Sequence, residues 1–158
     1  KANNIRDYHA ANIKNKGAFA PYNLYMNTLL DNVNEGWIMV LDDDDRLAHS
    51  DVIEEIVNHI EDADTMLIWK MQFQNGKILP DKASFETTIP LCGKIGSPCF
   101  LVHSKWKDVA KWDPFKRGDF RYIDKLYNKV PQNKWIDEVF VYLSNTGEGL
   151  GKRKDIKI

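Results

Sequence analysis

The sequence has 158 residues, of which 43% are hydrophobic and 28% are charged, and its formal net charge is −1. A chain of this length fits one ordinary domain that buries a core without disulfides or a structural metal. The near-zero charge excludes a global field that would attract nucleic acid, and no apolar run reaches the ~20 residues of a membrane span. We therefore expect a single domain over residues 1–158 with no nucleic-acid partner.

The cysteine content bears on the cellular compartment. Cys92 and Cys99 are too few for a disulfide framework. Free, buried thiols are typical of a reducing compartment, so we expect a cytoplasmic protein.

The first predicted elements are a helix over residues 18–32 and a strand over residues 37–41. The helix is indicated by apolar residues at helical spacing, and Asn34-Glu35-Gly36 ends the pattern. These apolar residues are Phe19, Tyr22, Met26, Leu29 and Leu30. The strand is a continuous apolar run, which is typical of a strand buried on both faces.

The middle of the chain predicts a second helix over residues 51–61, a strand over residues 65–73 and a hairpin partner over residues 77–79. Ser50 or Asp51 would cap the helix, with Glu54 completing a capping box. The apolar face of this helix would consist of Val52, Ile53, Ile56, Val57 and Ile60. Asn75-Gly76 is a strong signal for the hairpin turn.

The remainder predicts an irregular segment over residues 80–96, a strand over 99–103, a helix over 120–130 and a strand over 136–143. Helices that alternate with buried strands indicate an α/β fold, with a mixed, mostly parallel sheet flanked by helices. In such open sheets, ligands bind beyond the carboxyl ends of the strands.

Four consecutive acids, Asp42, Asp43, Asp44 and Asp45, follow the first strand at such an end. In an extended chain Asp42 and Asp44 would share one face. Paired carboxylates are hard oxygen ligands that suit Mg²⁺ or Mn²⁺, and these ions also bind substrate phosphates. The alternative is a solvated acidic turn, or a charge that complements a helix dipole.

Four segments in order resemble family 2 glycosyltransferases of the GT-A fold. Residues 36–45 resemble the family's stretch that ends in Leu-Asp-Ala-Asp-Asp, and residues 15–23 are similar to its Asn-x-Gly-x-x-x-Ala-Arg-Asn segment. Residues 96–103 resemble the strand that opens the acceptor side, and residues 117–123 stand where the family carries an acidic pair at a helix start. The resemblance covers roughly residues 12–130.

The resemblance implies roles for individual residues. Asp44 would bind the metal, Asp42 would assist it or face the ribose, and Asp119 would be the general base for the acceptor hydroxyl. Asn23 and Asp43 would complete the donor-binding set. Without the family argument, the simpler reading of Asp119 is a carboxylate that stabilises a helix N-terminus.

An aromatic residue outside these segments is a candidate for the acceptor site. Trp112, beside Asp113-Pro114, could stack on a sugar ring, and the alternative is packing in the core.

The sequence also departs from the family pattern. Tyr22 replaces an arginine, Gly118 replaces the first acid of the pair, and nothing before Lys1 corresponds to the first strands of a GT-A domain. We therefore expect a chain truncated at its N-terminus, with any peripheral membrane association made through the missing segments.

The resemblance divides the chain into a donor and metal side (residues 1–45), an acceptor side (46–143) and a flexible basic tail (144–158). It implies a metal-dependent, inverting transfer of a sugar from a UDP- or GDP-sugar to a glycan or other hydroxyl acceptor. The alternatives are a nucleotidyl- or phosphotransferase with an acidic metal site, and a non-catalytic module that keeps the fold.

Overall fold

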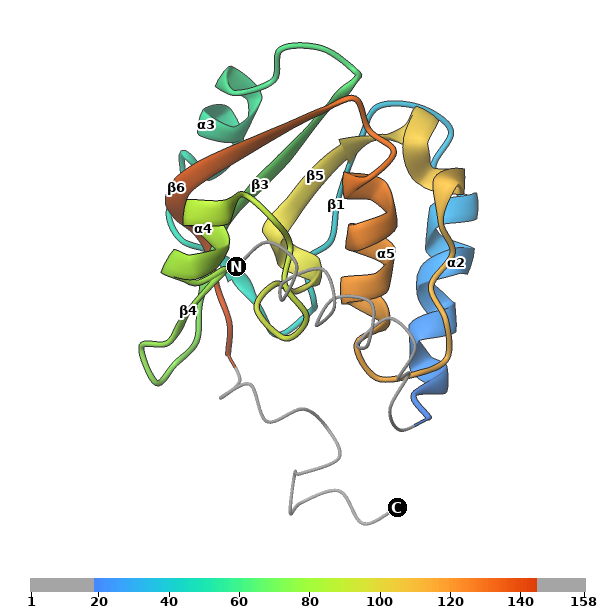
Figure 1. Ribbon diagram of the computed structural model, residues 1–158, viewed down its shortest axis with the longest axis horizontal. Helices are drawn as coiled ribbons and strands as arrows, with labels where there is room; N and C mark the ends of the chain where they lie inside the picture. Colours follow the sequence, from blue (N-terminus) through green and yellow to red (C-terminus); the bar gives the residue numbers. More distant parts are fainter. Residues whose placement is uncertain (1–18, 145–158) are drawn as a thin grey trace.

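The computed structural model describes residues 19–144, which form a sheet with helices on both faces (Figure 1). The strands are β1 (Trp37–Met39), β2 (Arg46–Leu47), β3 (Thr65–Gln72), β4 (Ile78–Leu79), β5 (Phe100–His103) and β6 (Gln132–Tyr142). The helices are α2 (Leu24–Asp31), α3 (Val52–Asn58), α4 (Lys82–Thr87) and α5 (Gly118–Tyr127), with 3₁₀ turns η1 (Pro21–Asn23), η2 (Ser97–Cys99) and η3 (Ser104–Val109). Within this part of the chain, no helix is both long enough and apolar enough to cross a membrane.

The sheet has the order β1-β5-β3-β6-β2, and β4 pairs with β3 as a short hairpin partner. Only β3 and β6 pair in parallel, whereas the other four pairings between the described strands are antiparallel. The prediction of a mixed sheet flanked by helices is confirmed, but the prediction that it is mostly parallel is wrong. The reason is β5, which runs in the opposite direction between β1 and β3 and so makes both of its pairings antiparallel.

The directions of the strands decide what meets at each edge of the sheet. β5 is antiparallel to both β1 and β3, and β6 is parallel to β3, so β1, β3 and β6 all point the same way. Their carboxyl ends, which are followed by residues 40–45, 73–77 and 143–144, therefore lie along one edge. We call this the acidic edge, because Asp42–Asp45 lie on it.

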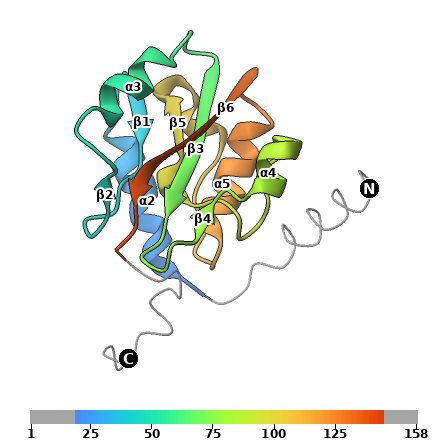
Figure 2. The ribbon, with the colours of Figure 1, turned by 90° about the vertical axis from the view of Figure 1, so that its left-hand side faces the viewer.

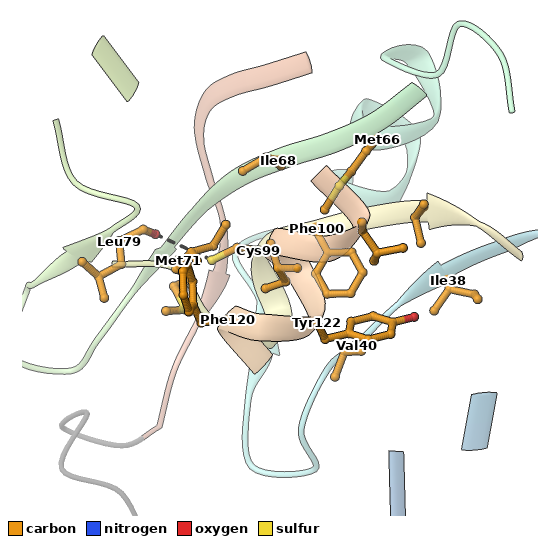
Figure 3. Packing of buried hydrophobic residues seen from close by; sticks show 14 of the residues in the cluster. Ile38, Val40, Met66, Ile68, Met71, Leu79, Cys99, Phe100, Phe120 and Tyr122 are labelled. Atoms are coloured by element: carbon orange, nitrogen blue, oxygen red, sulfur yellow. Dashed lines mark hydrogen bonds between the residues drawn. The ribbon is translucent and has the colours of Figure 1, made fainter. Parts of the chain in front are cut away.

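The core has one layer on each face of the sheet (Figures 1 and 2). α2 and α5 cover the face that includes Met66, Ile68 and Met71 of β3, and α3 covers the face that includes Leu67 and Trp69. Figure 3 shows the first layer, in which Phe120 and Tyr122 of α5 pack against β3 and β5. Side chains along β3 thus point alternately into the two core layers, as expected for a central strand.

Several local predictions are confirmed with small shifts in their ends. The strand predicted over residues 65–73 is β3, and the turn at Asn75-Gly76 leads to β4, with Gly76 at a φ of 81°. α5 and β6 begin earlier than predicted. The segment predicted to be irregular over residues 80–96 contains α4, whose N-cap Asp81 accepts a hydrogen bond from the Ser84 amide at 3.2 Å. This Asp-x-x-Ser spacing is the signal that could have revealed the helix.

The predicted apolar faces of the first two helices are partly wrong. Leu30 of α2 is buried, but Phe19, Tyr22 and Leu29 are 67%, 48% and 60% exposed. In α3, Val52 and Ile56 are buried whereas Ile53 and Val57 are about half-exposed. A helix on one face of a sheet buries only a narrow stripe of its side chains. The spacing of apolar residues therefore predicted more buried residues than the helices have.

The predicted capping box of α3 is also absent. Asp51 is the N-cap residue, but its side chain makes no capping hydrogen bond to the helix. Its carboxylate instead accepts a hydrogen bond from the Ser50 hydroxyl at 2.7 Å.

Candidate functional site

The acidic segment at the edge of the sheet is a closed turn. β1 ends at Met39, two residues earlier than predicted, and it is half-buried at the sheet edge rather than buried on both faces. The Asp42 carbonyl accepts a hydrogen bond from the Asp45 amide at 3.1 Å. The extended geometry that would place Asp42 and Asp44 on one face is therefore wrong. The turn forms because β2 must reverse direction to pair with β6.

Asp45 anchors this turn to the last strand. Its carboxylate accepts a hydrogen bond from the Ser144 amide at 3.1 Å, just beyond the end of β6. Burial raises the pKa of Asp45, the Ser144 hydrogen bond opposes that shift, and the other three acids add to it. Asp45 is thus used in holding the turn in place.

Asp42 is also crowded by neighbouring acids. The residue as a whole is exposed, but its carboxyl group is partly surrounded by protein, and this desolvation is the first cause that raises its pKa. Asp44 and then Asp43 raise the pKa of Asp42 further. A cation bound at this turn would relieve the repulsion, which fits a site made of hard oxygen ligands.

Asp119 lies at the start of α5 and faces the acidic edge. Burial raises the pKa of Asp119, backbone amides and Arg121 lower it, and Asp42 raises it by the smallest of these effects. A Cβ atom on Gly96 would lie 3.0 Å from Met71 Cε and 3.7 Å from Asp119 Oδ2, so the carboxylate sits close above the end of β3. The charge of Asp42, far from Asp119 in the sequence, therefore reaches the Asp119 carboxylate.

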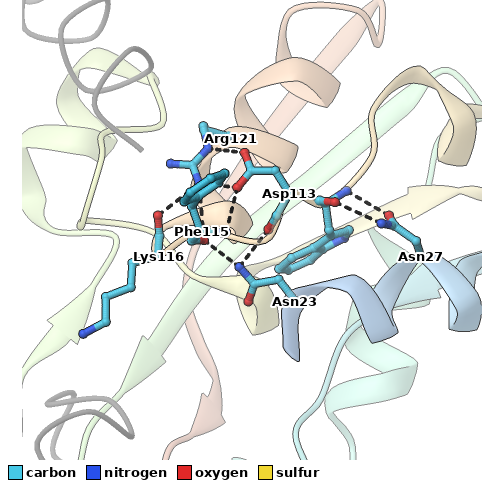
Figure 4. Close-up of polar contacts among 7 residues, drawn as sticks. Asn23, Asn27, Asp113, Phe115, Lys116 and Arg121 are labelled. Carbon is cyan, nitrogen blue, oxygen red and sulfur yellow. Dashed lines mark hydrogen bonds and ion pairs between the residues drawn. The ribbon is translucent and has the colours of Figure 1, made fainter. Parts of the chain in front are cut away.

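The loop before Asp119 is held by Asn23 (Figure 4). The Asn23 side-chain amide donates hydrogen bonds to the carbonyls of Asp113 at 3.1 Å and Phe115 at 2.7 Å. Gly118 packs against the same amide, and a Cβ atom there would lie 2.5 Å from Asn23 Nδ2. Asn23 thus positions the loop, which differs from its predicted donor contact. The close approach also explains why glycine stands where an acid was expected.

An ion pair that sequence reasoning missed holds the same loop. The Arg121 guanidinium donates to both carboxylate oxygens of Asp113 at 2.5 Å, and further to the carbonyls of Phe115 and Lys116. The Arg121 side chain is 7% exposed, and bidentate pairs of this kind are strong and specific. No regular spacing links the two positions, so the sequence offers no signal for the pair.

Trp112 lies in the core. It is 5% exposed, and its ring stacks on Tyr122 with centroids 5.3 Å apart and an interplanar angle of 25°. Its backbone exchanges two hydrogen bonds of 2.9 Å with the Asn27 side chain (Figure 4). The prediction that Trp112 stacks on an acceptor sugar is therefore wrong in this conformation, because the ring presents no open face.

Asp44 borders a cleft of about 480 Å³ at the acidic edge. The rest of the lining comes from β2, from the end of β3 and from the end of β6, so the cleft joins Asp44 of the predicted donor side with residues of the predicted acceptor side.

The basic run of the predicted tail lies outside the described residues. The two cysteines are buried and free, as expected.

Within residues 19–144, no group of three or more His, Cys, Asp or Glu side chains is arranged to hold a metal ion. The described residues therefore do not form a metal site built from protein ligands alone. Mg²⁺ and Mn²⁺ are commonly held by one or two carboxylates together with substrate phosphates and water, and Asp42 and Asp44 could supply that smaller set.

A comparison of the sequence with models of protein families finds no matching family, and a comparison with curated proteins finds no significant match.

Proposed function

We propose that this chain is a metal-dependent glycosyltransferase that moves a sugar from a UDP- or GDP-sugar to a hydroxyl acceptor with inversion. The observation that carries the proposal is that Asp42 in the acidic turn is among the charges that raise the pKa of Asp119 at the start of α5, which puts a carboxylate from another part of the chain near the turn. The resemblance of residues 36–45 and 117–123 to family 2 glycosyltransferases adds to it.

The acidic turn would serve the donor. Asp44 and Asp42 would hold Mn²⁺ or Mg²⁺ together with the diphosphate of the nucleotide sugar. When bound, such an ion neutralises charge that develops on a leaving diphosphate. Asp43 lies between them, is exposed as they are, and would add to the local negative charge that attracts the cation.

Asp119 would serve the acceptor. A general base must accept a proton while a bond forms, and a carboxylate whose pKa is raised holds that proton more strongly. The acceptor hydroxyl would attack the sugar carbon from the face opposite the diphosphate, its proton would pass to Asp119, and the nucleoside diphosphate would leave. Backbone amides at the start of α5 would keep the carboxylate oriented.

Donor binding can be tested by thermal unfolding with MnCl₂ and UDP or GDP. We expect a metal-dependent rise in stability, about 2.7 kcal/mol at a ligand concentration 100 times its dissociation constant. Asp44→Asn should abolish this rise. Asp64→Asn is the matched control, because it removes one carboxylate at the opposite edge of the sheet, where Asp64 pairs with Lys105. The absence of any metal-dependent rise in the unmodified chain would contradict the proposal.

The role of Asp119 can be tested separately from binding. Asp119→Asn should keep the response to manganese and nucleotide but slow nucleoside diphosphate release in the presence of acceptor by about 10²–10⁴-fold. Glu138→Gln, an exposed acid on β6, is the control and should keep the wild-type rate. Loss of nucleotide binding in Asp119→Asn would refute its assignment as the base.

A further inference from the structure

The outward side of α2 is apolar although it faces solvent. Tyr22, Tyr25 and Leu29 recur at helical spacing and therefore share one side of η1 and α2. Tyr25 is 74% exposed, and the other two are about half-exposed, as is the neighbouring Leu24. Figure 1 shows α2 at the outer side of the helix layer that it forms with α5. A solvated helix normally carries charged residues on its outward side, but residues 19–30 contain none.

Two asparagines of the same segment point inward instead. Asn23 donates to two carbonyls of the loop before α5, and Asn27 exchanges hydrogen bonds with the Trp112 backbone (Figure 4). Polar residues thus fix α2 in place, while its tyrosines lie outside. Contiguous apolar residues left exposed in this way mark an interaction surface. We call this side, with the exposed Phe19 at its start, the α2 surface.

α3 also exposes apolar residues, but in a different setting. Ile53 and Val57 are about half-exposed, and Glu54 and Glu55 lie between them in the sequence. Single apolar residues among charged ones are ordinary on a solvated helix and need no partner. The α2 surface is therefore the stronger candidate, and α3 supplies a matched control.

The C-terminal end of the α2 surface is acidic. Asp31 and Asp108 both pair with Lys111, at 3.1 and 3.0 Å. Lys107 donates to a backbone carbonyl just after α2, and the exposed Glu35 follows shortly after that carbonyl in the sequence. Carboxylates thus outnumber ammonium groups among these five residues, which leaves this end with an excess of negative charge.

The N-terminal end of the α2 surface is basic. The loop before α5 pairs with the residues before η1, and it presents the exposed Lys116 and Arg117. In a two-fold dimer the same surface of each copy meets the other. If the two α2 helices are antiparallel, the basic end of each copy meets the acidic end of its partner. The surface is therefore complementary to itself in charge.

We propose that the α2 surface binds the α2 surface of a second copy of this chain, with the two helices antiparallel. A fully enclosed aromatic side chain buries about 150–250 Å², so the three exposed aromatic residues and two leucines supply on the order of 500 Å² per copy. That area is close to the lower limit of about 1,000 Å² in total for a specific interface, so the dimer is weak. The proposal involves no metal, nucleotide or sugar, and it stands or fails independently of the proposed function.

The test is sedimentation velocity of the unmodified chain at low ionic strength. We expect the sedimentation coefficient to rise from monomer to dimer between about 10 µM and 1 mM, the range of a small interface. A monomer at every concentration would overturn the proposal. Flotation with vesicles of phosphatidylcholine and phosphatidylglycerol covers the other occupant, because a monomer that floats with them would assign the α2 surface to a membrane and overturn the dimer.

Variants then locate the interface. Leu29→Glu and Tyr25→Ser should each weaken dimerisation by about 10-fold or more, as expected for residues at the centre of an interface. Ile53→Glu on α3 is the matched control and should keep the wild-type dimer. Circular dichroism and thermal unfolding will show that all three variants keep the fold. A dimer that survives both α2 variants, or an equal loss in Ile53→Glu, would place the interface elsewhere and refute the proposal.

Charge reversal tests the antiparallel arrangement. Lys116→Glu and Asp31→Lys should each weaken the dimer by roughly 3- to 10-fold, because each brings like charges together at both ends of the two-fold interface. The double variant restores opposite charges across the interface and should recover most of the wild-type affinity. A double variant weaker than either single variant would contradict the antiparallel dimer.

Discussion

Asp42 shows how one residue can work against the stability of its own fold. Desolvation and the neighbouring acids raise the pKa of its carboxyl group. Between the unfolded and the folded pKa, the native state binds more protons than the unfolded state, so stability falls as pH rises. The cost is fully present at neutral pH and disappears below the pKa of the unfolded residue.

Asp42→Asn should therefore raise the stability of the metal-free protein at pH 7. The gain should shrink as pH falls and vanish by about pH 3, below the usual aspartate range. Urea unfolding at both pH values with a chelator present measures this. Asp64→Asn should show no such gain, and a gain for Asp42→Asn that persists at the lower pH would contradict the assigned cause.

Gly118 is the second residue whose identity has a steric cause. Gly118→Ala should cost about 1–3 kcal/mol, because the new methyl group would meet the Asn23 amide and the Asp113 carbonyl. Asn23→Ala frees part of that space, so the double variant should cost less than the sum of the two single changes. Denaturant unfolding of the three variants measures the coupling. Strict additivity would show that the contact does not limit the site.

At the scale of elements, the loop between η3 and α5 depends on contacts that come from elsewhere in the chain. Asn23 of η1 and Asn27 of α2 hold it from one side, and Arg121 of α5 holds it from the other (Figure 4). These contacts set where α5 begins, and α5 in turn sets where Asp119 lies. The position of the proposed base is therefore a property of three elements together.

Arg121→Met should destabilise the protein by about 3 kcal/mol, at the low end of the range for a broken buried pair, because Asp113 keeps some exposure. Arg121→Lys should cost less, since it keeps the charge but loses the bidentate geometry. Pairing Arg121→Met with Asp113→Leu should recover part of the loss. Urea midpoints for the set measure the effect. A loss below about 1 kcal/mol for Arg121→Met would place the pair with weak surface ion pairs.

At the scale of the whole molecule, the sheet is stable in its centre and less protected at its borders. β3 is paired on both sides and is almost wholly buried, whereas the described pairing of β1 is with β5 alone. Amide hydrogen exchange should therefore be slowest in β3 and the adjoining part of β6, and faster in β1 and β2. Exchange followed by NMR measures the order. Equal protection in β1 and β3 would mean that β1 has another partner in solution.

The elements that depend on local chemistry could be predicted from the sequence. The Asn75-Gly76 turn, the buried β3 and the helix that carries Asp119 follow from turn residues, apolar runs and spacing. α4 was missed although its Asp81 cap carries a local signal. The acids after β1 were also found, because an apolar run followed by four aspartates is visible in the sequence itself.

What the sequence determined by itself is thus the α/β class, the approximate elements and the candidate acids Asp42, Asp44 and Asp119. Only the tertiary structure decided the direction of β5, the burial of Trp112 and the closed turn at Asp42–Asp45. It also decided that Asp42 is among the charges that raise the pKa of Asp119, and that Asp44, Gln72 and Tyr142 line one cleft. The physical reason is that local patterns report which residues are apolar or turn-forming, whereas strand order and direction depend on contacts between segments far apart in the chain.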